Sequence, residues 1–461
     1  MTSRKFDSTS PQRPDTIIGS FLATSPDEVR AARDRARVAQ REWWNCAPVA
    51  RATALSACAQ AITAHRGELA DLVIAEVGKP RMEATGEVDR AAAIMRYFAQ
   101  LALAPVGDHL PAPGPVGSVL LDTRRPRGVA GLITPWNFPL AIPLWKAAPA
   151  LAAGNAILLK PAPEATATAA RLAALLAAHL PDGLVSVLPG DAQTGAAVVT
   201  ASDVLSFTGS TEVGRRIASA AVAAGVAVQT EMGGLNASVV LADADVTRAA
   251  ATIASAAMGY AGQKCTATSR VIIVGENKDF TDALVAAVEA LGTGDPDVST
   301  TVVGPVISAQ ARTAVIDAAA SAHLDGARVL TGGTAGDPGW FVSPTLVDGL
   351  GEQAALHHDE VFGPIASLQY AASTEDAVRL VNSTRYGLVT GLFTRDLDQA
   401  LELVPRFETG MVKVNGPTTG ADFHASFGGE KDSGYGPAEQ GRHVLDFYSR
   451  HHTVSLSPSS A

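Results

Sequence analysis

Cysteine, aromatic residues and net positive charge are all scarce in this chain. Only three of its 461 residues are cysteines, and Cys46, Cys58 and Cys265 cannot all pair. Such usage is typical of the reducing cytoplasm rather than of a secreted protein held together by disulfides. The formal net charge of −10 argues against a nucleic acid or an anionic membrane surface as the main partner.

No secretory signal and no unbroken apolar run of membrane length are visible. Residues 1–14 lack the apolar core of a signal peptide. The most apolar stretch, residues 128–159, is interrupted by four prolines and several polar residues. It is better explained as a strand, a loop, a helix and a second strand than as a membrane span. We therefore expect a soluble, cytoplasmic protein.

The chain also lacks the two common phosphate-binding motifs. Residues 207–214 read Phe-Thr-Gly-Ser-Thr-Glu-Val-Gly, which is neither GxGxxG nor a P-loop. The segment does have the pattern of a strand, a turn and the start of a helix. Because free N–H groups at a helix start attract phosphate, it remains a candidate pyrophosphate site.

What the chain does have is a long alternation of apolar strands and helical stretches. A first helix is predicted after Ser25, where Glu28 completes a capping box. From Gly128 onward, short apolar runs alternate with helices, and a second such series begins at Ser238. Strands separated by helices pair in parallel, so the pattern predicts an α/β protein with a doubly wound, nucleotide-binding sheet and a second α/β domain.

Three residues have side chains suited to acyl chemistry. Cys265 lies in Gly-Gln-Lys-Cys-Thr, a candidate nucleophile, although an unpaired cysteine more often packs as a small hydrophobe. Asn137 follows a strand, and its amide is able to donate to an oxyanion. Glu231 ends another strand beside two glycines and is a candidate general base. Taken singly, Asn137 and Glu231 also fit an ordinary loop amide and a solvated carboxylate.

Two further segments have residues suited to ligand binding. Lys160 ends a buried strand, at the edge where open α/β sheets bind their ligands. Glu360 and Phe362 precede a tight Gly-Pro turn, which by itself is also compatible with a plain strand entry.

In order and spacing these segments resemble the NAD(P)-dependent aldehyde dehydrogenase superfamily over nearly the whole chain. The resemblance implies Cys265 as nucleophile, Glu231 as general base and Asn137 as oxyanion-hole amide. It implies NAD or NADP as cofactor and no metal. The residues that match cofactor-contact positions are Trp136, Lys160, Gly190, Gly209, Ser210, Val213, Glu360 and Phe362.

The same resemblance implies a division of the chain. We expect an aldehyde dehydrogenase-like fold with a Rossmann-type cofactor-binding domain, an α/β catalytic domain and a small β arm that joins subunits into a homodimer or homotetramer. The expected limits are 1–103 and 127–234 for the cofactor-binding domain, 235–414 for the catalytic domain, and 104–126 with 444–461 for the arm.

The motif around Cys265 and the C-terminal run from Val414 to His424 are similar to bacterial α-ketoglutarate semialdehyde (2,5-dioxovalerate) dehydrogenases. Such an aldehyde needs a cation near the site, and Lys264 is one candidate. Leu235 and Glu430 depart from the usual residues of that group, and an added anion at the mouth would disfavour a carboxylate.

An apolar or aromatic aldehyde therefore remains an alternative, with a pocket predicted from Phe138, Trp145 and Phe423. A CoA-acylating aldehyde dehydrogenase is another alternative. Pro163 stands where many NAD-preferring members have a glutamate, so we expect NADP to be tolerated.

Overall fold

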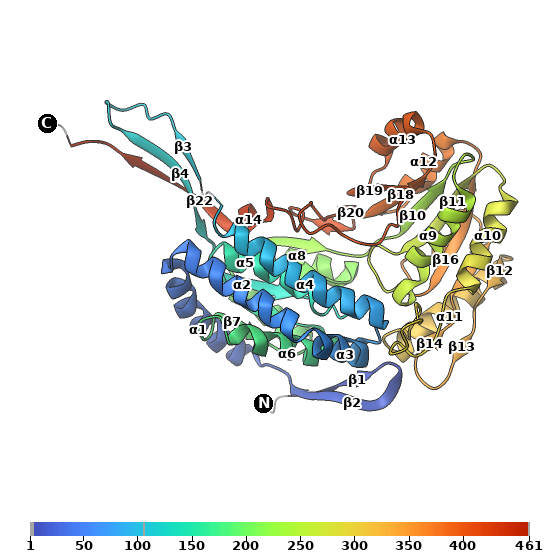
Figure 1. Ribbon diagram of the computed structural model, residues 1–461, viewed down its shortest axis with the longest axis horizontal. Helices are drawn as coiled ribbons and strands as arrows, with labels where there is room; N and C mark the ends of the chain where they lie inside the picture. Colours follow the sequence, from blue (N-terminus) through green and yellow to red (C-terminus); the bar gives the residue numbers. More distant parts are fainter. Residues whose placement is uncertain (1–3, 105–106, 460–461) are drawn as a thin grey trace.

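The computed structural model describes residues 4–104 and 107–459. Two sheets lie side by side, and a narrow three-stranded arm extends from one end of the molecule (Figure 1). The expected α/β class is confirmed. Parts of three predicted segments, namely residues 1–3, 105–106 and 460–461, lie outside the described residues. No helix in the described ranges is both long and apolar enough to cross a membrane.

The first sheet has six strands in the order β21-β9-β8-β5-β6-β7. The chain adds β6 and β7 on one side of β5 and then returns to its other side with β8 and β9. Loops after β5 and β8 therefore diverge at a switch point, the place where such sheets bind ligands. The strands are β5 (Val129–Ile133), β6 (Ala156–Lys160), β7 (Val185–Val187), β8 (Val204–Thr208), β9 (Ala227–Glu231) and the short antiparallel β21 (Gly434–Tyr435).

Eight helices, counted over the described residues, accompany this sheet. The predicted capping box at the first of them is confirmed, since Ser25 N–H donates to the Glu28 carboxylate at 2.8 Å and Glu28 N–H donates to Ser25 Oγ at 3.3 Å. Helix α4 packs against α2, α3 and α5. The helices are α1 (Pro26–Asn45), α2 (Pro48–Ala64), α3 (Arg66–Val77), α4 (Arg81–Leu101), α5 (Ala141–Ala152), α6 (Thr166–Ala177), α7 (Ala192–Ala201) and α8 (Thr211–Ala223).

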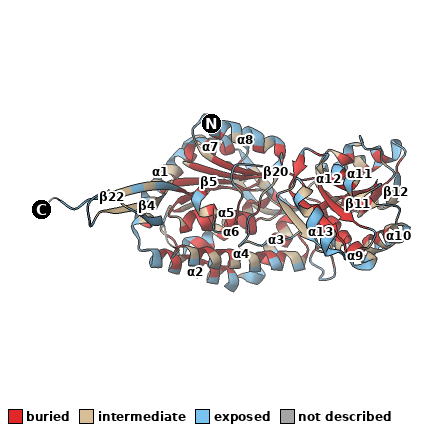
Figure 2. Cartoon of the chain, turned by 90° about the horizontal axis from the view of Figure 1, so that it is seen from above, coloured by how far each residue is buried: buried red, intermediate tan, exposed pale blue. Residues whose placement is uncertain are grey.

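The second sheet has seven strands in the order β12-β15-β16-β11-β10-β18-β19. All neighbours pair in parallel except β12 and β15. The central strands of both sheets, such as β5 and β8 in the first and β10 and β18 in the second, are buried along their whole length (Figure 2). The strands are β10 (Asn236–Val240), β11 (Thr268–Val274), β12 (Arg328–Thr331), β15 (Thr345–Asp348), β16 (Ile365–Ala371), β18 (Val389–Phe393) and β19 (Met411–Val414); the helices are α9 (Val246–Met258), α10 (Lys278–Glu289), α11 (Ala309–Leu324), α12 (Thr374–Asn382) and α13 (Leu397–Leu403).

The arm joins two segments that are far apart in sequence, as predicted. Strand β22 (Ser449–Leu456) pairs along its whole length with β4 (Val119–Pro126), which also pairs with β3 (Gly107–Leu110). A hairpin of β1 (Lys5–Ser10) and β2 (Arg13–Leu22) was not predicted, because its residues are mainly polar and half-exposed. The remaining short elements are η1 (Pro163–Ala165), η2 (Gly259–Gly262), β13 (Ala335–Gly336), β14 (Phe341–Val342), η3 (Ala355–His357), β17 (Tyr386–Gly387), η4 (Val404–Arg406), β20 (Glu430–Lys431) and α14 (Val444–Phe447).

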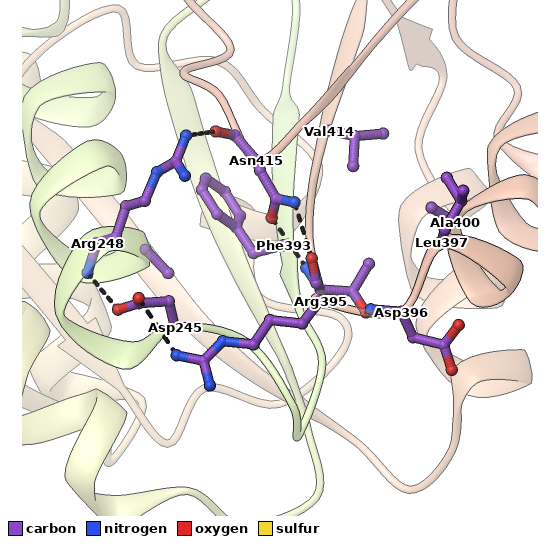
Figure 3. Close-up of a pocket in the computed structure, with 11 residues that line it drawn as sticks. Asp245, Arg248, Phe393, Arg395, Asp396, Leu397, Ala400, Val414 and Asn415 are labelled. Atoms are coloured by element: carbon purple, nitrogen blue, oxygen red, sulfur yellow. Dashed lines mark hydrogen bonds and ion pairs between the residues drawn. The ribbon is translucent and has the colours of Figure 1, made fainter.

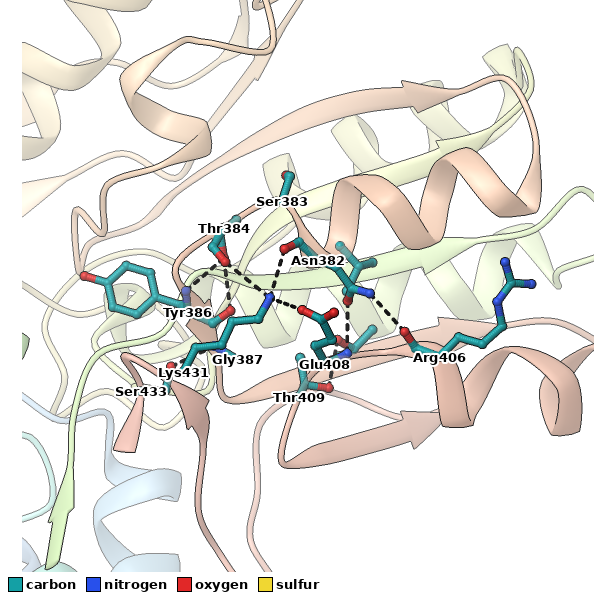
Figure 4. A network of polar contacts seen from close by, with 12 residues as sticks. Asn382, Ser383, Thr384, Tyr386, Gly387, Arg406, Glu408, Thr409, Lys431 and Ser433 are labelled. Carbon is teal, nitrogen blue, oxygen red and sulfur yellow. Dashed lines mark hydrogen bonds and ion pairs between the residues drawn. The ribbon is translucent and has the colours of Figure 1, made fainter. Parts of the chain in front are cut away.

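A C-terminal segment, residues 428–439, crosses back from the second sheet to the first. Lys431 Nζ pairs with Glu408 at 2.6 Å and donates to the Asn382 carbonyl at 2.9 Å, while Ser433 Oγ accepts the Gly387 N–H at 3.0 Å (Figure 4). These contacts hold the segment so that β21 adds to the edge of β9. The crossing segment is thereby fixed beside Glu231, the last residue of β9.

Candidate active site

The carboxyl edge of the first sheet faces the amino edge of the second, and hydrogen bonds join them. The Asn137 side-chain amide, after β5, donates to the Gln263 carbonyl at 2.9 Å. Gly234 N–H, after β9, donates to the Glu360 carboxylate at 3.1 Å. The structure thus brings the predicted catalytic and nicotinamide-side segments into one place.

Cys265 is half-buried on the loop before β11. Two residues of that loop, Tyr260 and Ala261, have φ angles of 55° and 53°, a left-handed conformation that is rare outside glycine. A Cβ added at Gly262 would lie 2.2 Å from the Gly363 carbonyl oxygen, so only glycine fits there. Burial, followed by the charges of Glu360 and Glu231, raises the pKa of the Cys265 thiol to about 12.

The Asn137 side chain is buried and only partly hydrogen-bonded. The residue is 4% exposed, and one of its two amide hydrogens is used by Gln263. The other hydrogen has no acceptor within the described part of the chain, nor does the buried Oδ1 have a donor there. Orphaned polar atoms of a buried amide are costly unless a ligand satisfies them.

Glu231 is buried at the end of β9, and its Oε2 has no hydrogen-bond partner within the described residues. Burial and then the negative charge of Glu439 raise the pKa of Glu231, while Lys146 opposes the shift. A carboxyl group with a raised pKa is suited to accept a proton from water near neutral pH.

The buried pair of Lys146 and Glu439 behind Glu231 was missed from the sequence. Lys146 Nζ forms an ion pair with Glu439 Oε1, and the same oxygen accepts the Ser206 hydroxyl at 2.8 Å. The other carboxylate oxygen accepts the Trp145 indole N–H at 2.7 Å. The sequence offered one signal for this pair, namely that Lys146 is a charged residue in an otherwise apolar helix, which is buried on all sides in the structure. No feature of the sequence around Glu439 indicated a buried ion pair.

The predicted cofactor residues lie along the carboxyl edge of the first sheet. Lys160 ends β6 with 8% exposure, and its Nζ has no hydrogen bond or ion pair within the described ranges. Ser210 precedes α8 without capping it, so the N–H groups of the first turn, Val213 included, are open to a ligand. A cofactor with a pyrophosphate fits such a cation and helix start.

Two predicted glycines leave room at the same edge. A Cβ at Gly209 would lie 2.6 Å from the Phe207 ring, and one at Gly190, where φ is 153°, would lie 2.1 Å from Thr194 Oγ1. Neither position accepts a side chain without rearrangement, which keeps the backbone accessible to a ligand.

Phe362, two residues after Glu360, contacts Trp136, which follows β5 of the first sheet. The rings of Trp136 and Phe362 meet edge to face, with centroids 5.8 Å apart. Burial raises the pKa of Glu360 to about 7, although the Gly234 N–H and the Arg385 charge act in the other direction.

A cavity of about 300 Å³ opens at Cys265. Phe138, Trp145 and Lys264, which were proposed as pocket residues, line it, and Phe427 adds a ring 5.5 Å from that of Trp145. Phe423 does not line the cavity. Its ring packs 5.6 Å from Tyr97 instead, because the loop that carries Phe423 folds onto α4.

The two departures noted in the sequence are not at the mouth of this cavity. Glu430 lies exposed on β20, paired with β17. Leu235 is buried and lines a separate small space together with Val361 and Ile365. The expectation that Glu430 adds an anion at the mouth is therefore wrong.

A second cavity, of about 380 Å³, lies at the carboxyl edge of the second sheet. It is bordered by Arg248, whose guanidinium donates to the Asn415 carbonyl at 3.1 Å, and by Arg395, which pairs with Asp245 at 3.3 Å (Figure 3). No predicted site residue lines this cavity.

The chain matches the Aldehyde dehydrogenase family over residues 1–454. An alpha-ketoglutarate semialdehyde dehydrogenase of Haloferax volcanii is 36% identical over 464 residues, covering 98% of this chain and 96% of that protein. An alpha-ketoglutaric semialdehyde dehydrogenase of Bacillus subtilis is 33% identical, covering 96% of this chain and 92% of that protein.

Among solved structures, betaine aldehyde dehydrogenase of Staphylococcus aureus in complex with NAD+ superposes with a TM-score of 0.94 at 28% identity, covering 99% of this chain and 92% of that one. The predicted aldehyde dehydrogenase-like fold is confirmed. The chain belongs to the aldehyde dehydrogenase family and is an oxidoreductase that acts on aldehydes.

Proposed function

We propose that this protein oxidises an aldehyde bearing a distal carboxylate, of the α-ketoglutarate semialdehyde kind, to the carboxylic acid with NAD or NADP. The observation that carries the proposal is the joint position of Cys265, Asn137 and Glu231 between the two sheets. The substrate class is supported by the similarity to α-ketoglutarate semialdehyde dehydrogenases and by the absence of Glu430 from the cavity lining.

In this proposal the Cys265 thiol releases its proton to solvent, and its sulfur then attacks the aldehyde carbon. The carbonyl oxygen becomes an oxyanion that accepts the free Asn137 amide hydrogen and the Cys265 backbone N–H. A bound nicotinamide cofactor would supply the acceptor for the hydride that leaves the carbon. The residues that would hold this cofactor are Trp136 and Phe362, whose rings are in contact, and Glu360, whose carboxylate would accept ribose hydroxyls.

The thioester left on Cys265 must be hydrolysed. Glu231 takes a proton from water, the oxygen of that water bonds to the acyl carbon, and the bond from carbon to sulfur breaks. The acid leaves, and the proton held by Glu231 passes to the Cys265 sulfur, which restores the thiol. The charges of Glu439 and Lys146 set the basicity of Glu231 from behind.

The residues that follow β6, at the carboxyl edge of the first sheet, bear on the choice between NAD and NADP. Pro163 replaces the carboxylate that would repel a 2′-phosphate, and Glu164 one residue later is exposed. We infer that both NAD and NADP are used.

The domain limits given above, assembly through the arm and a place in the cytoplasm complete the proposal. Strands β3 and β22 are the open edges of the arm, and β19 is an open edge of the second sheet. Pairing of such edges between two or four subunits supports a homodimer or homotetramer, which light scattering tests. All three cysteines are free, as in a reducing compartment.

Formation of reduced cofactor from α-ketoglutarate semialdehyde and from pentanal, each with NAD and with NADP, tests the proposal. A higher kcat/KM for the charged aldehyde supports it, and a preference for pentanal contradicts the substrate class. A rate increase on addition of CoA favours the CoA-acylating alternative.

A further inference from the structure

One face of α4 borders the cavity at Cys265. Glu83, Glu87 and Arg90 follow one another at spacings of four and three residues, so their side chains share that face. The helix begins beside the loop that carries Cys265 and continues past the cavity to Tyr97, against which Phe423 packs. Charged side chains of α4 are therefore placed to contact the end of a substrate that lies away from Cys265.

Every charged side chain that lines the cavity, with one exception, forms an ion pair within the described residues. Lys264, the predicted anchor, pairs with Glu83 at 2.8 Å. Glu87 forms an ion pair with the buried Lys79 and accepts the N–H groups of Leu140 and Ala141. Among the charged residues that line the cavity, Arg90 alone has no ion pair within the described part of the chain.

The guanidinium of Arg90 is half-buried and held in place. One of its terminal nitrogens donates to the Ala421 carbonyl, in the loop that forms the opposite wall. This single hydrogen bond leaves the other N–H donors of the planar guanidinium group available to a ligand. A guanidinium fork matches a carboxylate with two parallel hydrogen bonds, and partial burial strengthens them relative to an exposed pair.

Three aromatic rings contribute to the lining of the cavity that Arg90 and Cys265 share. They belong to Phe138, Trp145 and Phe427. Lys79 lies 3.6 Å from the Phe138 ring centre, on a side removed from solvent, and so fixes that ring. An aliphatic chain with an aldehyde at one end and an anion at the other is the ligand that such a cavity favours.

We propose that Arg90, rather than Lys264, is the residue that binds the distal carboxylate of the substrate and so determines specificity. The inference rests on the proposed function, because it assigns a residue to the substrate class stated there. Lys264 is neutralised by Glu83 and therefore contributes little to this selection.

The test compares Arg90→Gln with the wild-type enzyme on α-ketoglutarate semialdehyde and on pentanal. We expect KM for the charged aldehyde to rise about 10- to 100-fold, the effect of losing hydrogen bonds to a charged group. The kcat for either aldehyde and the KM for pentanal should change less than about threefold. Arg90→Lys, which keeps the charge and loses the fork, should give an intermediate KM.

The matched control is Arg96→Gln, an exposed arginine on the same helix that donates to Thr63 at 2.7 Å. It makes the same change of charge and should leave both KM values unchanged. A purely structural role for Arg90, through its bond to Ala421, predicts equal losses on both aldehydes and overturns the inference.

The failure of the inference differs from the failure of the proposed function. If the wild-type enzyme prefers the charged aldehyde and Arg90→Gln keeps that preference, the inference alone is wrong. If the wild-type enzyme prefers pentanal, both are wrong.

Discussion

In the six-stranded sheet the site residues follow the strands, whereas in the seven-stranded sheet they precede them. Asn137, Lys160 and Glu231 come at or after the carboxyl ends of β5, β6 and β9. Cys265 and Glu360 come before the amino ends of β11 and β16. The first sheet thus obeys the general rule for open α/β sheets, and the second reverses it.

The short connection between the sheets explains the difference. Strand β9 ends at Glu231 and β10 begins at Asn236, so the second sheet starts where the first one ends. Its amino edge then faces the carboxyl edge of the first sheet, and loops before its strands complete a shared site. Its own carboxyl edge carries the cavity beside Arg248 and Arg395. Strand polarity alone does not locate a site where two sheets meet.

The largest expected effect is that of Cys265→Ala, which removes the reacting atom supplied by the amino edge of the second sheet. We expect kcat with any aldehyde to fall by about four orders of magnitude or more, as for other lost nucleophiles. Steady-state formation of reduced cofactor measures the loss. Unchanged cofactor binding is the control, and retained turnover would remove Cys265 from the chemistry.

Asn137→Ala tests the contribution of the carboxyl edge of the first sheet. Loss of one oxyanion-hole donor should lower kcat about 10²- to 10³-fold, with KM changed much less. The same substitution removes the bond to the Gln263 carbonyl, so thermal unfolding should be measured in parallel. A fall in Tm without a fall in kcat would show that the amide is structural.

The pKa of Glu360, raised to about 7 by burial, predicts a pH dependence of cofactor affinity. Below this pKa the carboxyl is protonated and loses acceptor capacity for the ribose hydroxyls. Between about pH 6 and about pH 8 the ionised fraction rises about tenfold, so the Kd for NAD should fall by about the same factor. Fluorescence titration measures this, and Glu360→Gln should give a flat profile; an equal slope in that variant would contradict the assignment.

The smallest effect is expected at the carboxyl edge of the second sheet. Arg395→Gln should change kcat and KM less than about twofold, since Arg395 lines only the cavity remote from Cys265. A large loss of activity with an unchanged Tm would mean that this edge takes part in the reaction, and the contrast between the sheets would fail.

Much of the fold could be predicted from local pattern. Helix α1 begins directly after Ser25, as predicted, because a capping box is a local signal, and β6 ends at Lys160, where the predicted buried strand ends. Strand β21 has only two residues and exists through its pairing with β9. Such an element leaves no periodic signal, and the crossing segment 428–439 was therefore not predicted.

In the candidate site, residues that lie in one short motif could be predicted, whereas contacts between residues far apart in sequence could not. Each of the residues Cys265, Glu231 and Asn137 lies in a short motif of its own. Lys146 and Glu439 are separated by 293 positions, and their role near Glu231 becomes visible only when the fold brings them together as a buried pair. The neutralisation of Lys264 by Glu83, 181 positions away, was hidden for the same reason.

The most direct test of the central claim uses Glu231→Gln, which leaves the nucleophile in place and removes the base. The variant is mixed with α-ketoglutarate semialdehyde and NAD, quenched in acid and digested, and its peptides are measured by mass spectrometry. The account predicts one equivalent of reduced cofactor per active site and an acyl group on the peptide that contains Cys265. Full turnover, or an acyl group on Cys46 or Cys58, would contradict it.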